Sequence, residues 1–283
     1  MKVLVTGGTS YLGQHMVPYF AEAGQEVVYT WRSTQLDLGS DAIQLDIRNE
    51  KAVEQTILAV KPAAVIHLAA SNRSENEALM TSSIIEGATN ITNCCKRNGI
   101  RLIHMSTDVV FNGTDAPYAE LDKKNPVHAY GQSKSAAEEI VLAHANSVVI
   151  RPSLIYGLRI KDRSTEWIES ALQKSQPVTL FTDQIRNPVW VDTLSSACLE
   201  LLDHEFNGLI HIVGNQTLSR AVFGVRMLDF WNIQVGDTLR FAPTPENLNW
   251  PPDLRMDTQL AKETLKTPLL GVDEVLRLFN KKA

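Results

Sequence analysis

Tyr130 and Lys134 form a pair whose residue types and spacing suggest chemistry. They stand four positions apart in the stretch HAYGQSKSAAEE, which has a helical pattern, so both side chains should project from one face. A free phenol has a pKa of about 10, too high for ready proton exchange at neutral pH. A neighbouring ammonium stabilises the phenolate and lowers that pKa. The pair could therefore act as a general acid toward a carbonyl oxygen, although the same spacing occurs by chance in many helices.

Two further polar residues follow the strand that precedes this helix. Thr107 and Asp108 stand at the end of the apolar run IRLIHMST, and open α/β sheets bind their ligands beyond the carboxyl ends of their strands. The Thr107 hydroxyl could hydrogen-bond the same carbonyl oxygen and polarise it, while Asp108 adds a carboxylate. The alternative for Thr107 is a hydroxyl that caps the local backbone.

A glycine turn opens the chain, in the stretch KVLVTGGTSYLG. Gly7 can take a positive φ in a tight turn, and Gly13 would let the following helix pack close to the strands. The amino terminus of that helix would then face a pyrophosphate. Ser10 stands where a dinucleotide fingerprint often has glycine, and its hydroxyl can itself donate to a phosphate oxygen. The order strand, turn, helix predicts a dinucleotide site; the alternative is a plain tight turn.

Arg32 indicates which dinucleotide would bind. The second predicted strand, 26–31, continues as Arg32-Ser33 and lacks the acid that usually binds a ribose 2'-hydroxyl. A guanidinium at this place suits a 2'-phosphate. We therefore expect NADPH (NADP) as cofactor, with NAD as the alternative; a solvated surface arginine is the other interpretation of Arg32.

Strand and helix patterns alternate through the first half of the chain. Strands are predicted over 2–6, 26–31, 42–46, 63–70, 100–107 and 147–153, and helices over 11–24, 50–61, 78–99 and 128–145. Strands separated by helices indicate βαβ units and a parallel sheet, and apolar strands without polar alternation fit a sheet covered on both faces. The fold class expected is α/β, with a doubly wound parallel sheet of the Rossmann-like type.

The second half of the chain has a looser pattern. Helices are predicted over 164–175, 193–204, 219–233 and 272–280, a strand over 208–214 and a proline-rich loop over 242–254. We expect residues 1–155 to form the dinucleotide-binding domain, with a returning segment near 186–215. Residues 156–185 and 216–283 would then form a smaller, mostly helical C-terminal substrate lobe.

Composition excludes several classes of protein. The net charge of −5 argues against a nucleic-acid binder, and no apolar run approaches the roughly 20 residues that span a bilayer. The three cysteines fit neither a zinc motif nor a disulfide framework, and no signal peptide is evident, so we expect a cytoplasmic protein with buried thiols. His67, His104 and His128 lie on separate elements, so no metal site is expected.

Several motifs together resemble a known family. The stretches VTGGTSYLG, LDIRN, VIHLAA, STDVVFNG, YGQSK and RPSLIYG have the order and spacing of the extended short-chain dehydrogenase/reductases. Within that family, the segment from STDVVFNG to YGQSK looks most like the dTDP-4-dehydrorhamnose reductase branch. The resemblance is good over residues 1–160 and weaker beyond them.

This resemblance implies roles for individual residues. Thr107, Tyr130 and Lys134 would form a catalytic triad with Tyr130 as proton donor, and Asp108 would support the proton relay or the substrate. Tyr130 and Lys134 would also contact the cofactor. The other cofactor-binding residues implied are Gly7, Ser10, Tyr11, Leu12, Arg32, Asp46, Ile47, Ala69 and Ala70. Proteins of this family often form dimers through helices of the main domain, so this chain could form a homodimer, although nothing in the sequence alone establishes one.

Two departures from the family pattern bear on function. Ile84 stands where many members have an asparagine that helps to order the active site, so the usual proton relay is in doubt. The stretch after Tyr156 has few sugar-nucleotide features. Four basic residues there could pair with a substrate diphosphate or could simply be solvated: Arg159, Lys161, Arg163 and Arg186.

Three functions follow from these observations. The first is an NADPH-dependent reductase that transfers hydride to the keto group of a nucleotide-linked sugar. The second is the same chemistry on another small-molecule carbonyl substrate, because a fold does not determine its substrate. The third is a non-catalytic NADP-binding regulatory subunit, since one subunit of methionine adenosyltransferase resembles this same branch.

Overall fold

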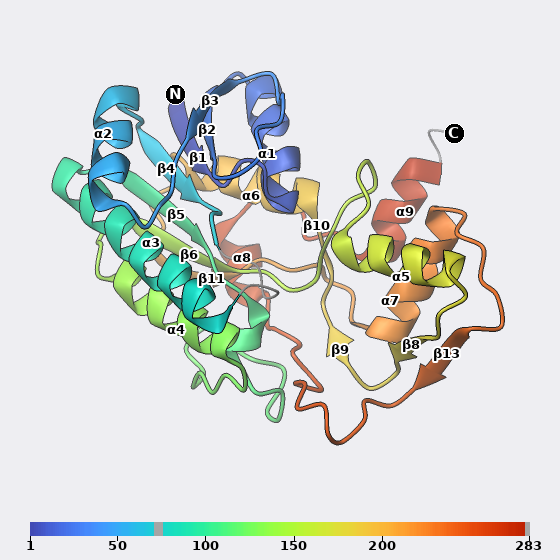
Figure 1. Ribbon diagram of the computed structural model, residues 1–283. Coiled ribbons are helices and arrows are strands. Elements are labelled where there is room, and N and C mark those ends of the chain that lie inside the picture. The colour runs from blue at the N-terminus through green and yellow to red at the C-terminus, as the bar shows by residue number, and fades with distance from the viewer. Residues whose placement is uncertain (71–75, 281–283) are drawn as a thin grey trace.

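A parallel sheet forms the centre of the molecule in the computed structural model, which describes residues 1–70 and 76–280 (Figure 1). Within these residues the sheet has seven strands in the order β11-β6-β5-β4-β1-β2-β3. Their bounds are β1 Lys2–Thr6, β2 Glu26–Trp31, β3 Asp41–Gln44, β4 Ala64–His67, β5 Arg101–Met105, β6 Ser147–Arg151 and β11 Gly208–His211. The strand order reverses direction between β1 and β4, and such a switch point is where doubly wound sheets bind ligands. The predicted Rossmann-like fold is confirmed.

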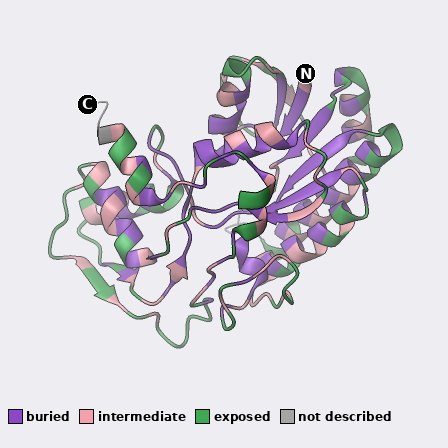
Figure 2. Ribbon diagram, turned by 180° about the vertical axis from the view of Figure 1, so that it is seen from behind, coloured by how far each residue is buried: buried purple, intermediate pink, exposed green. Residues whose placement is uncertain are grey.

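Helices cover both faces of the sheet, which explains the apolar strands. On one face lie α1 (Tyr11–Glu22), α6 (Val191–Leu201) and α8 (Gln259–Thr264), and on the other lie α2 (Glu50–Val60), α3 (Glu77–Asn98) and α4 (Ala129–Leu142). Each face has its own apolar cluster, and alternate residues of one strand enter different clusters: Val3 and Val5 the first, Leu4 the second. Figure 2 shows the central strands β4, β5 and β6 buried along their length, whereas the edge strand β3 is exposed or half-buried.

A smaller lobe lies beside the carboxyl ends of the strands (Figure 1). Its helices are α5 (Arg163–Gln173), α7 (Arg220–Phe230) and α9 (Val272–Asn280). Short strands that were not predicted complete it: β8 (Val178–Phe181) pairs with β13 (Leu239–Ala242), and β9 (Ile185–Arg186) pairs with β12 (Leu218–Ser219). At its junction with the main sheet, β7 (Ile155–Tyr156) pairs with β10 (Val189–Trp190). Strands of two to four residues are too short to show a period of two in the sequence.

One segment departs from the expected division of the chain. Residues 216–283 were expected to lie in the lobe, but α8 returns to the main sheet. Ala261, Leu265 and Leu269 belong to the same apolar cluster as the inner faces of α1 and α6. The main domain therefore takes residues from three separate stretches of sequence.

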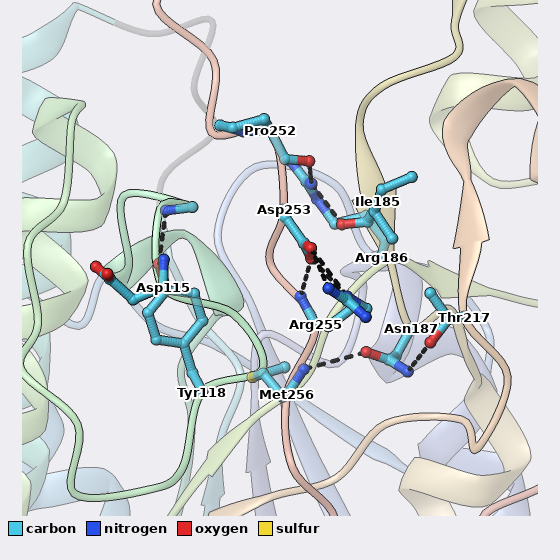
Figure 3. Close-up of polar contacts among 11 residues, drawn as sticks. Asp115, Tyr118, Ile185, Arg186, Asn187, Thr217, Pro252, Asp253, Arg255 and Met256 are labelled. Carbon is cyan, nitrogen blue, oxygen red and sulfur yellow. Dashed lines mark hydrogen bonds and ion pairs between the residues drawn. The ribbon is translucent and has the colours of Figure 1, made fainter.

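The end of the proline-rich loop forms an extended strap, residues 251–257, between the lobe and the main domain (Figure 3). On the lobe side, the Ile185 amide donates to the Pro252 carbonyl at 2.7 Å, and the Arg186 guanidinium donates to the Pro251 and Pro252 carbonyls at 2.8 and 3.0 Å. On the other side, the Tyr118 amide donates to the Arg255 carbonyl at 2.8 Å. The strap thus hydrogen-bonds to both parts and holds the preceding residue, Trp250, between them.

Candidate active site

The glycine turn between β1 and α1 is packed too closely for side chains. Gly7 has a φ of +71°, and a Cβ there would lie 2.7 Å from the Ala69 Cα at the end of β4. A Cβ on Gly13 would lie 2.5 Å from the carbonyl oxygen of Gly8. Both positions therefore need glycine, because the turn must contact the neighbouring strand end and the first turn of α1 at once.

Ser10 is the N-cap of α1. Its Oγ accepts a hydrogen bond from the Gly13 amide at 3.2 Å. A hydroxyl that accepts in this way keeps its own proton for donation, so Ser10 can cap the helix and donate to a ligand oxygen. The residue that departs from the fingerprint thus has a local structural function as well.

A cavity of about 470 Å³ opens over this turn, and we call it the turn cavity. Most of its lining residues come from the end of β2 and from the segments that follow β1, β2, β3 and β4. Six of the residues implied as cofactor-binding line it: Gly7, Ser10, Arg32, Ile47, Ala69 and Ala70. Their cofactor-binding role stays a prediction, but the fold brings all six to one cavity.

Five other residues implied as cofactor-binding do not line the turn cavity: Tyr130 and Lys134 on α4, and three residues outside that helix, Tyr11, Leu12 and Asp46. The Tyr11 hydroxyl donates to the Ile160 carbonyl at 3.1 Å, and Leu12 packs in the apolar cluster beneath α1. Asp46 is paired with Arg48, whose hydrogen bonds to the carboxylate hold the pKa of Asp46 below its ordinary value. In this structure the side chains of all three are engaged with protein groups.

Lys134 and Tyr130 lie on α4 in different environments. Lys134 is only 3% exposed, and its ammonium donates to the Met105 carbonyl at 2.6 Å and lies 3.3 Å from Nε2 of His104. Burial lowers the pKa of Lys134 to about 8, against a smaller opposing effect of Glu138. Tyr130, one turn earlier, is half-buried and faces a second cavity.

This second cavity, the tyrosine cavity, has a volume of about 430 Å³. Its walls come from α3, from the short helix η1 (Asp108–Val110), from the start of α4 and from the loop before the strap. The residues are Glu77, Met80, Val109, His128, Ala129, Tyr130 and Trp250. The phenol that was expected to donate a proton is therefore placed where a substrate could reach it.

Thr107 and Asp108 lie at the end of β5 in a buried polar group. The Thr107 hydroxyl donates to Asp108 Oδ1 at 3.3 Å and accepts from the Val109 amide at 3.4 Å, so it caps η1. The other carboxylate oxygen of Asp108 accepts from Ser153 at 2.7 Å and lies 3.7 Å from Arg186 Nε. Asp108 therefore orients the Thr107 hydroxyl and also lies close to Arg186, the residue that binds the Pro251 and Pro252 carbonyls of the strap.

Two buried histidines, not assigned a function from the sequence, lie beside Lys134. Strand register pairs Thr6 with His67 and His67 with His104, so the three side chains lie on one face of β1, β4 and β5. His67 Nδ1 is 2.7 Å from the Thr6 hydroxyl, and the two imidazole centres are 5.1 Å apart. Burial lowers the pKa of both rings, so both are neutral at neutral pH. Ile84, by contrast, lies in the apolar cluster of α3 and offers no polar group.

The lobe contains a third cavity, of about 520 Å³, between α5, β8 and α7; we call it the lobe cavity. Apolar side chains such as Leu180 and Phe223 and polar ones such as Asp162, Gln184 and Arg220 line it. Trp250 lines both this cavity and the tyrosine cavity, and its indole contacts the His128 ring edge-on at 5.2 Å. A ligand with two joined parts could thus occupy both cavities along Trp250.

The four basic residues noted after Tyr156 have different surroundings. Arg159 pairs with Asp192, Lys161 pairs with Glu169, and Arg186 binds the strap carbonyls. Arg163, in contrast, lines the turn cavity together with Gly7, Ser10 and Arg32. The sequence suggests only a substrate diphosphate or solvent as the partner of Arg163, because no local pattern places a lobe residue at the glycine turn.

Metal sites and membrane spans were not expected from the sequence. Residues 1–70 and 76–280 contain no group of three metal-ligating side chains, and none of their helices is long and apolar enough to cross a membrane. Cys94, Cys95 and Cys198 are buried free thiols, as predicted.

Comparison with known proteins places the chain in a family. The model of the RmlD substrate binding domain family matches residues 1–281. The chain belongs to this family. Among curated relatives, a probable low-salt glycan biosynthesis reductase of Haloferax volcanii is 29% identical over 240 residues, which are 81% of this chain and 80% of the relative. The same chain is also 29% identical to a dTDP-4-keto-6-deoxy-D-glucose reductase of Streptomyces niveus, over 74% of this chain and 71% of that protein.

Solved structures show the same fold over the full length of this RmlD-family chain. The dTDP-4-dehydrorhamnose reductase of Bacillus anthracis, crystallised with NADP, superposes with a TM-score of 0.85 at 21% identity and covers 100% of this chain and 99% of that one. Other curated relatives of this chain are named for a different activity. The methionine adenosyltransferase 2 subunit beta of Bos taurus is 26% identical over 82% of this chain and 72% of its own length.

Proposed function

We propose that this protein is an NADPH-dependent reductase acting on the keto group of a nucleotide-linked sugar, with Tyr130 as proton donor. The observation that carries the proposal is the placement of α4. It sets the buried ammonium of Lys134 one helical turn from the phenol of Tyr130, which faces a ligand-sized cavity. Relatives named as dTDP-sugar reductases support both the reaction and the class of substrate.

The turn cavity fits the diphosphate and adenosine of NADPH. Gly7 and Gly13 let the turn pack closely against Ala69 and against the start of α1 because they lack Cβ atoms, and Ser10 offers a hydroxyl proton on the same turn. Arg32 lines the same cavity after β2, where a 2'-phosphate would lie. A structure crystallised with NADP shares this fold, which supports the choice of cofactor.

The nicotinamide, when bound, would supply hydride to the carbonyl carbon. Tyr130 would donate its proton to the carbonyl oxygen, and the buried ammonium of Lys134 would stabilise the phenolate that remains. The Thr107 hydroxyl would turn from Asp108 to the same oxygen and stabilise the charge that develops on it. Trp250 and the lobe cavity would hold the nucleotide part of the substrate.

The test is an NADPH-oxidation assay with a panel of dTDP-linked 4-keto sugars and unlinked carbonyl compounds. We expect turnover with the nucleotide sugars. Tyr130→Phe should keep NADPH binding and lower kcat by at least a hundredfold, the order of loss for a general acid. Near-normal turnover in that variant contradicts the mechanism, and turnover with unlinked carbonyls alone contradicts the substrate class.

A second candidate function is a non-catalytic NADP-binding regulatory subunit. The similarity to the subunit beta of methionine adenosyltransferase 2 favours it. The presence of Thr107, Tyr130 and Lys134 together favours the reductase, because binding alone does not need all three. A protein that binds NADPH, reduces no member of the panel and changes the rate of a methionine adenosyltransferase would support the second candidate.

A further inference from the structure

Arg163 is the residue of the lobe that lines the turn cavity. The other lining residues come from the end of β2, from α3 and from the segments that follow β1, β2, β3 and β4. Arg163 instead begins α5 and is exposed. Within the described residues, 1–70 and 76–280, it has no acidic partner at ion-pair distance. Arg159 and Lys161, nearby in the same segment, each have one, so Arg163 differs from its neighbours.

The segment that leads to Arg163 is held against the start of α1. The Tyr11 hydroxyl donates to the Ile160 carbonyl at 3.1 Å. A Cβ on Gly157 would lie 2.8 Å from that hydroxyl and 2.9 Å from the His15 ring, so the backbone passes directly over this helix end. The start of α1 is where a dinucleotide diphosphate binds in such folds. Arg163 is therefore brought to the diphosphate end of the cavity, whereas Arg32 follows β2 at the adenosine end.

The first turn of α5 forms a wall between two cavities. Arg163 lines the turn cavity, whereas Asp162, Ser164 and Thr165 line the lobe cavity. Asp162 is buried and caps the helix, accepting from the Ser164 and Thr165 amides at 2.9 and 3.1 Å. A ligand that fixes Arg163 therefore fixes the same helical turn that forms part of the lobe cavity.

We propose that Arg163 binds the diphosphate of the dinucleotide and thereby couples occupancy of the turn cavity to the order of the lobe cavity. This inference rests on the proposed dinucleotide binding. A guanidinium suits a diphosphate because it forms paired, charge-assisted hydrogen bonds. Because coupling between binding sites is reciprocal, a ligand in the lobe cavity would in turn strengthen dinucleotide binding.

Binding measurements on the full chain test the first part. Arg163→Gln should raise the Kd of NADPH and that of NADH by the same factor, about fivefold to tenfold, since both contain the diphosphate. Arg159→Gln is the matched control: it removes the same charge from the same segment, but Arg159 pairs with Asp192 and lines neither cavity. It should leave both Kd values within about twofold, the effect expected of an exposed ion pair.

Hydrogen–deuterium exchange tests the coupling. In the wild type, NADPH should slow exchange in peptides over 157–173 as well as over the glycine turn. In Arg163→Gln saturated with NADPH, only the glycine-turn peptides should be protected. Equal protection of 157–173 in that variant overturns the proposal, as does an unchanged Kd or a loss confined to NADPH. A wild-type chain that binds neither dinucleotide overturns the proposed function as well, so the two failures are distinguishable.

Discussion

The ammonium of Lys134 lies 3.3 Å from Nε2 of His104, and both side chains are buried. The neutral imidazole accepts a hydrogen bond from the ammonium there, and the Met105 carbonyl accepts another at 2.6 Å. The charged groups and rings that face Lys134 are thus His104 on β5, His67 on β4 and Glu138 on its own helix. His104 therefore fixes the position of the Lys134 ammonium, one helical turn from Tyr130 on α4.

His104→Leu should therefore shift the alkaline limb of the kcat/KM profile to lower pH, by roughly one unit, the effect of losing one hydrogen bond to a charged group. The ammonium form of Lys134 loses an acceptor, so its pKa falls. His104→Gln retains an acceptor at similar reach and should keep the limb near that of the wild type. Equal shifts in the two variants would show that His104 acts only by filling space.

Lys134 should also make stability depend on pH. Its pKa falls from 10.5 to about 8 on folding because it is buried. Between pH 8 and 10.5 the unfolded chain binds the proton that the folded chain has released, so the free energy of unfolding rises with pH in this window. Lys134→Met lacks this effect, and the difference between the two proteins should grow by up to roughly 3 kcal/mol across the window. Urea unfolding at pH 7, 8.5 and 10 measures it, and a constant difference contradicts the prediction.

Arg32→Gln should change the choice between the two cofactors. Loss of the guanidinium should raise the Kd of NADPH about tenfold or more and leave that of NADH nearly unchanged, because only NADPH has the 2'-phosphate. Arg97→Gln removes the same charge from α3, where Arg97 pairs with Glu54 on the surface, and serves as control. Parallel loss of both affinities would mean that Arg32 contacts a group common to the two cofactors.

Gly13→Ala should disturb the turn itself. The new Cβ would lie 2.5 Å from the Gly8 carbonyl oxygen, so the turn or α1 must move. We expect dinucleotide binding to be lost and the free energy of unfolding to fall by about 1–3 kcal/mol, as for other overpacked sites. Gly236→Ala, where nothing lies within 4 Å of an added Cβ, is the matched control and should be neutral. Unchanged binding in Gly13→Ala would show that the turn tolerates a wider geometry.

Local patterns in the sequence determined the central sheet and most of the candidate site residues of this protein. The alternation of apolar strands and helices predicted the sheet, and the glycine turn, Arg32 and the four-residue spacing of Tyr130 and Lys134 predicted the main candidate residues. Such features depend on neighbours within a few residues, where backbone geometry alone decides which side chains lie together.

Only the tertiary structure decided the surroundings of these residues. The register of β4 and β5 places His67 and His104 side by side, and the packing of α4 then brings Lys134 to His104. The segment before α5 brings Arg163 to the turn cavity, although it is far from the glycine turn in the sequence. The strap holds Trp250 between the tyrosine cavity and the lobe cavity. These contacts join residues from 30 to more than 150 positions apart. They depend on how whole elements pack, which no local pattern of residue types records.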